Sequence, residues 1–255
     1  MEHRYQLLTS KEIKGHLSAG IDTVIFPIGS LEQHGPHAPV GTDGLIPEII
    51  ATKTAEKLGA LCLPPLWYGV SPHHMMFSGS ITIRPQLLAQ LVEDVLESLI
   101  HHGFQKILIF NGHGGNTASI DAARNMVRYR HPKVWTFLSS VWTVLADVYE
   151  ELPIEAQQEN WRTMIAHGGL LETSIVMAVE KDAVKLEEAR PVSVKRYVQA
   201  TDPALAVTVT MKDLSDVGSN GDATQANEEL GRMFIDRSVS QIVKKYQSAL
   251  DEFVR

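Results

Sequence analysis

Few residues in this sequence could crosslink the chain or anchor it in a membrane. Cys62 is the only cysteine, so no internal disulfide can form. No apolar run approaches the roughly 20 residues that a membrane-spanning helix needs. The N-terminal stretch MEHRYQLLTSKEIKGHL lacks the apolar segment and cleavage site of an export signal. These absences predict a cytoplasmic protein with no membrane contact.

Positive charge is scarce, and it is not concentrated in one region. Lys and Arg number 23 against 30 Asp and Glu, which gives a formal net charge of -7. Because nucleic-acid binding needs a concentrated basic surface, we expect a small-molecule ligand and no nucleic-acid partner. Internal repeats, low-complexity tracts and linkers are also lacking, so we expect a single domain over residues 1–255.

Apolar runs alternate with amphipathic segments along the chain. The runs expected to form strands are 22–30, 59–66, 105–116 and 133–142, with a further extended piece at 79–85. The segments expected to form helices are 9–20, 44–59, 85–103, 117–131, 168–183 and 224–253. The stretch 142–164 is less regular, and peripheral strands are expected at 190–198 and 204–211. This alternation predicts βαβ units, and therefore a mainly parallel sheet with helices on both faces.

Two loops that are rich in metal-ligating side chains each follow an expected strand. SLEQHGPHAPVGTD spans residues 30–43, and NGHGGN spans residues 111–116. Ligands of parallel α/β sheets bind at the carboxyl ends of the strands. We therefore expect both loops at the same edge of the sheet, close enough to form one site.

The spacing of the polar residues in these loops favours a common pocket. Glu32 and His34 lie two apart, so their side chains point the same way on an extended segment. Asp43 follows a loop whose Gly and Pro residues let the chain fold back. The glycines beside His113 allow the backbone to approach an ion or substrate, and Glu172 begins a later helix.

Two histidines and three carboxylates form the mixed ligand set that suits Zn²⁺ or Mn²⁺. Five protein ligands exceed what one catalytic zinc normally takes, which favours two cations that share a carboxylate. We expect Asp43 to be the bridge, Glu32 and His113 to complete one ion, and His34 and Glu172 the other. Taken singly, each loop residue could instead stabilise a turn by hydrogen bonding. Glu172 could instead be an acidic residue that interacts favourably with the positive end of the helix dipole.

Four motifs together resemble the creatininase, or creatinine amidohydrolase, superfamily: PIGSLEQHGPHAPVGTD, NGHGGN, HGGLLETS and GSNGDATQANEELG. The resemblance extends across nearly the whole chain. It implies a three-layer α/β/α sandwich with a mainly parallel sheet, a homo-oligomer that is often a hexamer, and two divalent ions that activate a water. It carries over Glu32, His34, Asp43 and His113 as metal ligands.

The same resemblance assigns the walls of the substrate pocket and shows where this chain departs. Trp142 and His167 match residues that line the creatinine pocket. Creatininase follows the motif histidine with an aromatic residue and a metal-binding glutamate, whereas Gly114 and Gly115 stand at these positions here. We infer that Glu172 supplies the missing carboxylate. Another aromatic residue of the creatinine pocket is also absent.

Further substrate contacts are expected from residues near the two loops. Gly114 and Gly115 would bring backbone close to the substrate, and His74 would contact it from the SPHHMMFSG turn unless it is a plain loop residue. His167, whose ordinary pKa is close to working pH, is expected to give a proton to the leaving nitrogen, with Glu172 as a second catalytic group. A capping role for His167 is the alternative.

The predicted activity is hydrolysis of a C–N bond in a small cyclic amide or a formamide by two Zn²⁺ or Mn²⁺ ions. Creatinine itself is disfavoured by the two departures. The main alternative is ring opening of a cyclic keto-polyol of the inosose type. A non-catalytic metal-dependent binding protein is an alternative of another class. A two-metal phosphoesterase is disfavoured because none of the central motifs contains the Arg or Lys that would neutralise phosphate.

Overall fold

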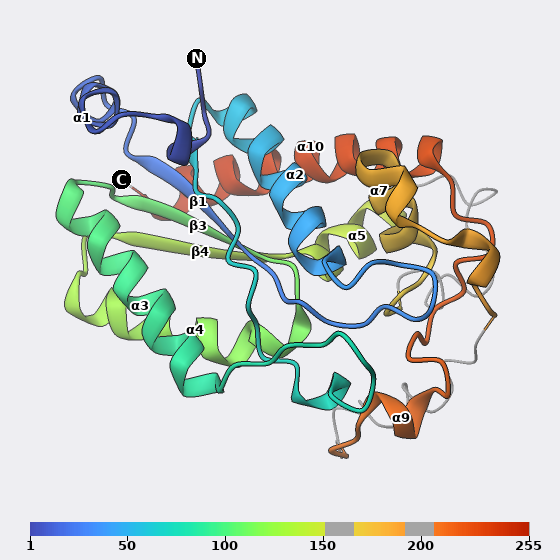
Figure 1. The fold of residues 1–255 in the computed structure, drawn as a ribbon. Helices are drawn as coiled ribbons and strands as arrows, with labels where there is room; N and C mark the ends of the chain where they lie inside the picture. The colour runs from blue at the N-terminus through green and yellow to red at the C-terminus, as the bar shows by residue number, and fades with distance from the viewer. Residues whose placement is uncertain (151–165, 192–206, 255) are drawn as a thin grey trace.

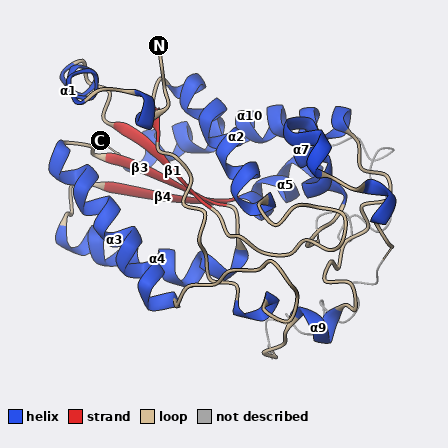
Figure 2. Cartoon of the chain, in the orientation of Figure 1, coloured by secondary structure: helices blue, strands red, loops and turns tan. Residues whose placement is uncertain are grey.

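A four-stranded parallel sheet lies at the centre of the computed structural model, which describes residues 1–150, 166–191 and 207–254 (Figures 1 and 2). The strand order is β2-β1-β3-β4, and every pair of neighbours is parallel. The strands are β1 (Thr23–Ile28), β2 (Leu61–Cys62), β3 (Lys106–Asn111) and β4 (Trp135–Ser140).

Helices cover both faces of this sheet (Figure 1). One face carries α2 (Thr42–Leu58), α5 (Val141–Glu150), α7 (Leu170–Glu180) and α10 (Glu228–Phe253). The other face carries α3 (Pro85–His102) and α4 (Thr117–Arg130). The shorter helices are α1 (Ser10–Ser18), α9 (Met211–Leu214) and the 3-10 turns η1 (Tyr5–Leu7), η2 (Pro72–His74), η3 (Gly114–Asn116), η5 (Lys181–Ala183) and η6 (Leu186–Glu188).

The strand residues alternate between two apolar cores, one on each face of the sheet. Ile25 and Leu108 belong to the core under α2, α5, α7 and α10, whereas Val24 and Ile107 belong to the core under α3 and α4. Successive side chains of a strand point to opposite faces, so a strand that is buried on both sides reads as a continuous apolar run. The predicted three-layer α/β/α sandwich is confirmed.

The connections around β1 create the crevice that positions the site. The chain leaves β1 through α2 on one face of the sheet and leaves β3 through α4 on the other. Because β1 and β3 are neighbours, their following loops diverge and leave a gap at the carboxyl ends of the two strands. Both metal-competent loops of the sequence begin at this gap.

Helix ends follow the sequence signals closely. Pro85 is the first residue of α3, and Gly103 ends it in the left-handed region with a φ of 110°. Gly59 ends α2 with a φ of 65°. The side chain of Asn227 caps α10 by accepting a hydrogen bond from the backbone N–H of Leu230. None of the described helices combines the length and apolar character that a bilayer crossing requires.

Three expectations differ from the structure. The second strand is only two residues long, because Pro64 and Pro65 follow it and proline cannot donate to a strand ladder. The extended piece at 79–85 joins no strand of the sheet, and its backbone pairing consists of isolated bridges of Ile81 with Leu31 and of Thr82 with Gly69. The stretch 142–164 is expected to be less regular, yet its described part, 142–150, belongs to α5, while 151–164 lie outside the described residues. The helix forms because apolar residues at helical spacing face the core: Val141, Val144, Leu145 and Val148.

Much of the C-terminal expectation falls outside the described residues. The peripheral strands expected at 190–198 and 204–211 lie mostly within 192–206, which the structure does not describe. In the described remainder, residues 207–210 have no regular structure and Met211 begins α9, so no strand forms there. Organisation of residues 1–255 as a single domain stays a prediction.

Candidate metal centre

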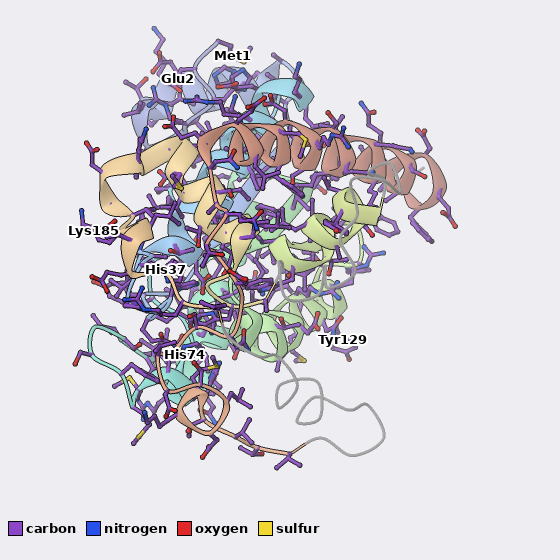
Figure 3. All side chains as sticks on the ribbon, turned by 90° about the vertical axis from the view of Figure 1, so that its right-hand side faces the viewer. Met1, Glu2, His37, His74, Tyr129 and Lys185 are labelled. Carbon is purple, nitrogen blue, oxygen red and sulfur yellow. The ribbon has the colours of Figure 1, made fainter. Side chains whose placement is uncertain are left out.

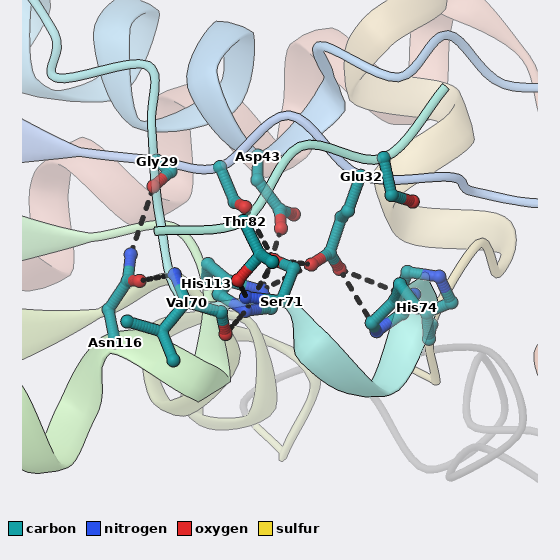
Figure 4. Close-up of polar contacts among 12 residues, drawn as sticks. Gly29, Glu32, Asp43, Val70, Ser71, His74, Thr82, His113 and Asn116 are labelled. Carbon is teal, nitrogen blue, oxygen red and sulfur yellow. Dashed lines mark hydrogen bonds and ion pairs between the residues drawn. The ribbon is translucent and has the colours of Figure 1, made fainter. Parts of the chain in front are cut away.

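Two carboxylates and one imidazole lie close together at the carboxyl ends of β1 and β3. Glu32 comes from the loop after β1, Asp43 is the second residue of α2, and His113 follows β3. Each is at most 3% exposed. His113 Nδ1 lies 2.9 Å from Glu32 Oε2 and 3.0 Å from Asp43 Oδ2 (Figure 4). One ligand atom from each residue lies within 4.8 Å of the others, which is the spacing of a metal-binding group.

A second group shares Asp43 with the first. His34 Nε2 lies 3.1 Å from Asp43 Oδ1 and 3.8 Å from Glu172 Oε1. Glu172 lies in the first turn of α7, and all three side chains are buried. The two carboxylate oxygens of Asp43 therefore face different histidines, one in each group. The structure thus brings together all five residues that the sequence nominated as ligands.

The loop after β1 folds back on itself to present Glu32 and His34 together. Glu32 N–H donates to Val40 O at 2.9 Å, and His34 forms an isolated antiparallel bridge with Ala38. Gly35 takes a φ of 72° at the tip, a conformation that favours glycine. Figure 3 views the molecule from the side on which these loops lie. The loop then enters α2 at once, which delivers Asp43 to the same pocket.

The chemistry of these side chains fits a pair of divalent cations. Asp43 Oδ2 and Glu172 Oε1 are buried and accept no hydrogen bond from the described residues. A buried carboxylate oxygen that accepts no hydrogen bond is costly, and a cation in each group would satisfy both oxygens. Imidazole nitrogens mixed with carboxylate oxygens form the ligand set of Zn²⁺ and Mn²⁺.

The five side chains also shift one another's protonation. Burial lowers the pKa of His34 and His113, but the neighbouring carboxylates outweigh burial and hold both values well above the ordinary one. For His34 these carboxylates are Asp43 and Glu172, and for His113 they are Glu32 and Asp43. Burial raises the pKa of Glu172 to about 7. Without a cation, the pocket therefore retains protons at neutral pH.

Cation uptake is expected to weaken as the pH falls, because a cation must displace the protons on His34 and His113. The raised histidine pKa values have the opposite effect on the metal-free fold: their stabilisation is present at low pH and is lost as the pH rises through those values. Calorimetric titration of chelator-treated protein with Mn²⁺ in buffers of different ionisation enthalpy measures the proton release. An affinity that stays constant between about pH 6 and pH 8.5 would contradict this assignment of the protons.

His167 lies beside both groups but differs from the other histidines in its protonation. Its Nε2 is 2.7 Å from Gln33 O, and a carbonyl can only accept, so Nε2 carries the hydrogen. Its Nδ1 therefore presents a lone pair, 3.5 Å from Glu32 Oε1. Burial, with the charge on His34, lowers the pKa of His167 to about 3, whereas the sequence predicts a value near working pH. The neutral ring can accept a proton at Nδ1.

Ser71 was missed by the sequence reasoning although it touches both sides of the first group. Its hydroxyl donates to Glu32 Oε2 at 2.6 Å and lies 3.1 Å from His113 Nε2 (Figure 4). Ser30 Oγ is a further 2.6 Å away. The available signal was topological: Ser71 follows β2, whose carboxyl end lies at the same edge of the sheet as the two loops.

Gln33 was also missed, and it links three parts of the site. Its Nε2 donates to Gly218 O at 3.0 Å and lies 2.8 Å from His74 Nδ1. Its Oε1 accepts from the backbone N–H of Gly35 at 2.9 Å. The signal was its place between Glu32 and His34, because its side chain points away from theirs on an extended segment. Its side chain therefore joins the first loop to His74 and to Gly218.

The residues expected to contact substrate follow β2, β3 and β4, at the edge of the sheet where the metal-binding groups lie. His74 is buried, with Nε2 3.4 Å from Glu32 Oε1. A Cβ on Gly115 would lie 2.2 Å from Val70 O, so this position has no room for a glutamate, whereas Gly114 is exposed to open space. Trp142 is half-buried at the start of α5, directly after the carboxyl end of β4. Contact of these residues with a substrate stays a prediction.

Comparison with protein families and curated proteins identifies relatives along most of the chain. A family model described as creatininase, creatinine amidohydrolase, matches residues 6–246. Creatinine amidohydrolase of Pseudomonas putida is 30% identical over 248 residues, covering 92% of each chain. A mycofactocin precursor peptide peptidase of Mycolicibacterium smegmatis is 30% identical over 178 residues, covering 68% of this chain and 64% of the relative. A 3-dehydro-scyllo-inosose hydrolase of Thermotoga maritima is 34% identical over 111 residues, covering 43% and 35%.

Solved structures of creatininase share this fold. A crystal structure of creatinine amidohydrolase has a TM-score of 0.83 and 27% identity, covering 99% of this chain and 98% of the other. A structure described as creatininase Mn has a TM-score of 0.82 and 28% identity over the full length of both chains. A mutant creatininase of the Zn-Zn type has a TM-score of 0.81 and 27% identity, again over both full lengths. Similar chains thus occur in manganese and zinc forms.

Proposed function

Because this chain belongs to the creatininase family of hydrolases, we propose that it uses two divalent cations to cleave a C–N bond of a small cyclic amide or a formamide. The observation that carries the proposal is the position of Asp43, whose two carboxylate oxygens face His34 and His113 in separate metal-binding groups. Glu32 and His113 would complete one cation site, and His34 and Glu172 the other. Zn²⁺ and Mn²⁺ both suit this ligand set.

When bound, the two cations would polarise a carbonyl group and make water nucleophilic near neutral pH. The surrounding side chains would do the remaining work. The hydroxyl of Ser71 fixes the orientation of the Glu32 carboxylate through its 2.6 Å hydrogen bond. Burial of all five ligands excludes bulk water and strengthens each electrostatic contact in the pocket.

His167 is suited to carry the proton. Gln33 O accepts from Nε2, which leaves Nδ1 free to take a proton and to return it to the leaving nitrogen. The low pKa of His167 leaves its ring neutral at neutral pH, with the lone pair on Nδ1. We therefore assign His167 the role of a proton carrier that is first a base and then an acid. Glu172, with a pKa raised to about 7, accepts a hydrogen bond at 2.7 Å from the backbone N–H of Gly168, the residue after His167.

An uncharged substrate agrees with the surroundings of the ligands. In the described part of the chain, no Lys or Arg forms a hydrogen bond or ion pair with the five residues. A phosphate ester would need such cations to neutralise its charge. A neutral amide or formamide would need only hydrogen-bond donors and the two metal ions.

Ring opening of a cyclic keto-polyol of the inosose type is the second candidate. The similarity to the Thermotoga maritima inosose hydrolase favours it, and so does Gly114, which borders open space where creatininase by resemblance has an aromatic residue. The open space beside Gly114 would accommodate a substrate that is larger or more polar than creatinine. Assembly as a homo-oligomer, with a hexamer as the family form, and residence in the cytoplasm stay predictions from the sequence.

Hydrolysis by the purified protein is expected to be lost on chelation and restored by Mn²⁺ or Zn²⁺, because the nucleophile depends on bound cations. The substrate panel would contain creatinine, hydantoins, formamides, inososes and short peptides. The amide or formamide proposal expects the highest kcat/KM on a C–N substrate, and turnover of inososes alone would favour the second candidate. His167→Ala is expected to lower kcat by about a hundredfold while the cation content stays at two per chain.

The His167 variant also separates catalysis from simple binding. A non-catalytic metal-dependent binding protein would retain all measurable function after His167→Ala, since binding needs no proton carrier. Fewer than one tightly bound divalent ion per chain in the wild-type protein would overturn the two-cation proposal itself.

A further inference from the structure

Trp67 packs against the backbone at the start of α2, the helix turn that carries Asp43. A Cβ added to Gly44 would lie 2.4 Å from both Cε3 and Cζ3 of the indole, and one added to Gly41 would lie 3.3 Å from Cζ3. These two glycines bracket Thr42 and Asp43. The six-membered ring of Trp67 therefore occupies the space that side chains would fill on either side of Asp43.

The first turn of α2 lacks the usual side-chain cap. Its N-cap residue is Gly41, which has no side chain that could accept a hydrogen bond from the first turn. A capping side chain normally satisfies an N–H of the first turn and fixes its position. Here the Thr42 side chain donates to Pro39 O at 2.7 Å, outside the helix. The indole contact with Gly44 therefore restrains the backbone that carries Asp43, together with the close packing of Gly29 and Gly112 against Asp43 O.

The carboxylate of Asp43 depends on this backbone for its position. Its Oδ1 lies 3.1 Å from His34 Nε2 and its Oδ2 lies 3.0 Å from His113 Nδ1, and both rings belong to the metal-binding groups themselves. A small movement of the first turn would therefore move the carboxylate relative to His34 and His113 together. Both metal-binding groups would be distorted by the same displacement.

The chain just before Trp67 pairs with the end of β1, the strand that leads into the loop with Glu32 and His34. The residue before it, Leu66, donates its N–H to Pro27 O at 3.0 Å and accepts from Gly29 N–H at 2.8 Å. Two residues after it, Gly69 forms an isolated bridge with Thr82. The backbone next to Trp67 is thus fixed to the end of β1, where the loop that carries Glu32 begins.

We propose that Trp67 is a positioning residue that sets the affinity for both cations by holding the backbone of Asp43 against the end of β1. The inference rests on the two-cation function proposed above and extends it to a residue that contacts neither metal-binding group. Residues that orient metal ligands typically change metal affinity by about 10- to 100-fold when they are replaced. The same range is expected for loss of the indole.

The test measures Mn²⁺ affinity by calorimetry on the chelator-treated full chain. Trp67→Leu is expected to weaken binding by about tenfold or more. Gly44→Ala alone is also expected to weaken it, because the new methyl group would overlap the indole. In the double variant the methyl group would fill part of the space left by the indole, so affinity is expected to recover above that of Trp67→Leu. This recovery distinguishes positioning from general destabilisation, because under general destabilisation the two losses of affinity would add.

Trp135→Phe is the matched control, because Trp135 lies on β4 with Arg128 over its ring, away from the metal-binding groups. Its Mn²⁺ affinity is expected to equal that of the wild-type protein. If Trp67→Leu fails to fold by circular dichroism, Trp67→Phe is the milder replacement and is expected to give an intermediate loss. Wild-type affinity in the Trp67 variant, or additive losses in the double variant, would overturn the inference. Absence of Mn²⁺ binding by the wild-type protein would instead overturn the proposed function.

Discussion

Replacing Asp43 by asparagine is expected to remove both cations and to lower kcat/KM by about a thousandfold, which corresponds to about 4 kcal/mol of transition-state stabilisation. Oδ1 of Asp43 faces His34, and Oδ2 faces His113, so the same side chain serves both groups. An amide carries no negative charge, and it offers one oxygen in place of two. Elemental analysis of the purified variant, together with its kcat/KM on the best substrate, checks this expectation.

Glu172→Gln provides the comparison, because Glu172 belongs to only one of the two groups that contain Asp43. One cation is expected to remain in this variant, held by Glu32, Asp43 and His113. The two variants therefore differ in metal stoichiometry, which does not depend on knowing the substrate. Retention of one full equivalent of cation by the Asp43 variant would show that the carboxylate is not shared.

The ligand set could be found from the sequence because its residues follow simple spacing rules. Glu32 and His34 alternate with a residue that points the other way, and His113 follows an apolar strand between glycines. Parallel strands place their following loops at one edge, so two such loops predict one site. Glu172 was already in this set as the acidic residue that begins a later helix, and the resemblance to creatininase added a second reason for it, the missing carboxylate at Gly115.

The supporting residues could not be found in this way, because their roles depend on contacts between distant parts of the chain. Gln33 joins the first loop to Gly218, which lies 185 residues later. Ser71 has no neighbour in sequence that identifies it as a partner of Glu32. Hydroxyl and amide side chains are common in loops, so their identity alone does not separate a structural turn from a site.

The role of the motif GSNGDATQANEELG also depends on contacts with distant parts of the chain, so the sequence alone could not assign it. The sequence offered it as part of a resemblance and assigned it no function. In the structure, the backbone N–H groups of Asn220 and Gly221 donate to His167 O at 2.9 and 3.0 Å. Gly218 takes a φ of 92°, and a Cβ there would lie 2.0 Å from Gln33 Oε1. The motif therefore anchors the turn that carries His167 against the first loop.

Gly112→Ala is expected to destabilise the metal-free protein by about 3 to 5 kcal/mol, the range of severe steric or cavity effects. A Cβ at this position would lie 2.2 Å from Asp43 O and 2.6 Å from Pro47 Cγ. The backbone carbonyl cannot rotate away as a flexible side chain would, so α2 would have to shift from the end of β3. Urea unfolding of chelator-treated protein measures the effect without a contribution from lost cations.

Gly114→Ala is the matched control for stability, because Gly114 lies two residues further along the same loop and a Cβ there meets no atom within 4 Å. Its unfolding free energy is expected to stay within about 0.5 kcal/mol of the wild-type value. Equal effects of the two substitutions would mean that the loop simply resists any added side chain. A large loss at Gly112 alone would locate the constraint at the contact between β3 and the first turn of α2, the same turn that places the shared carboxylate.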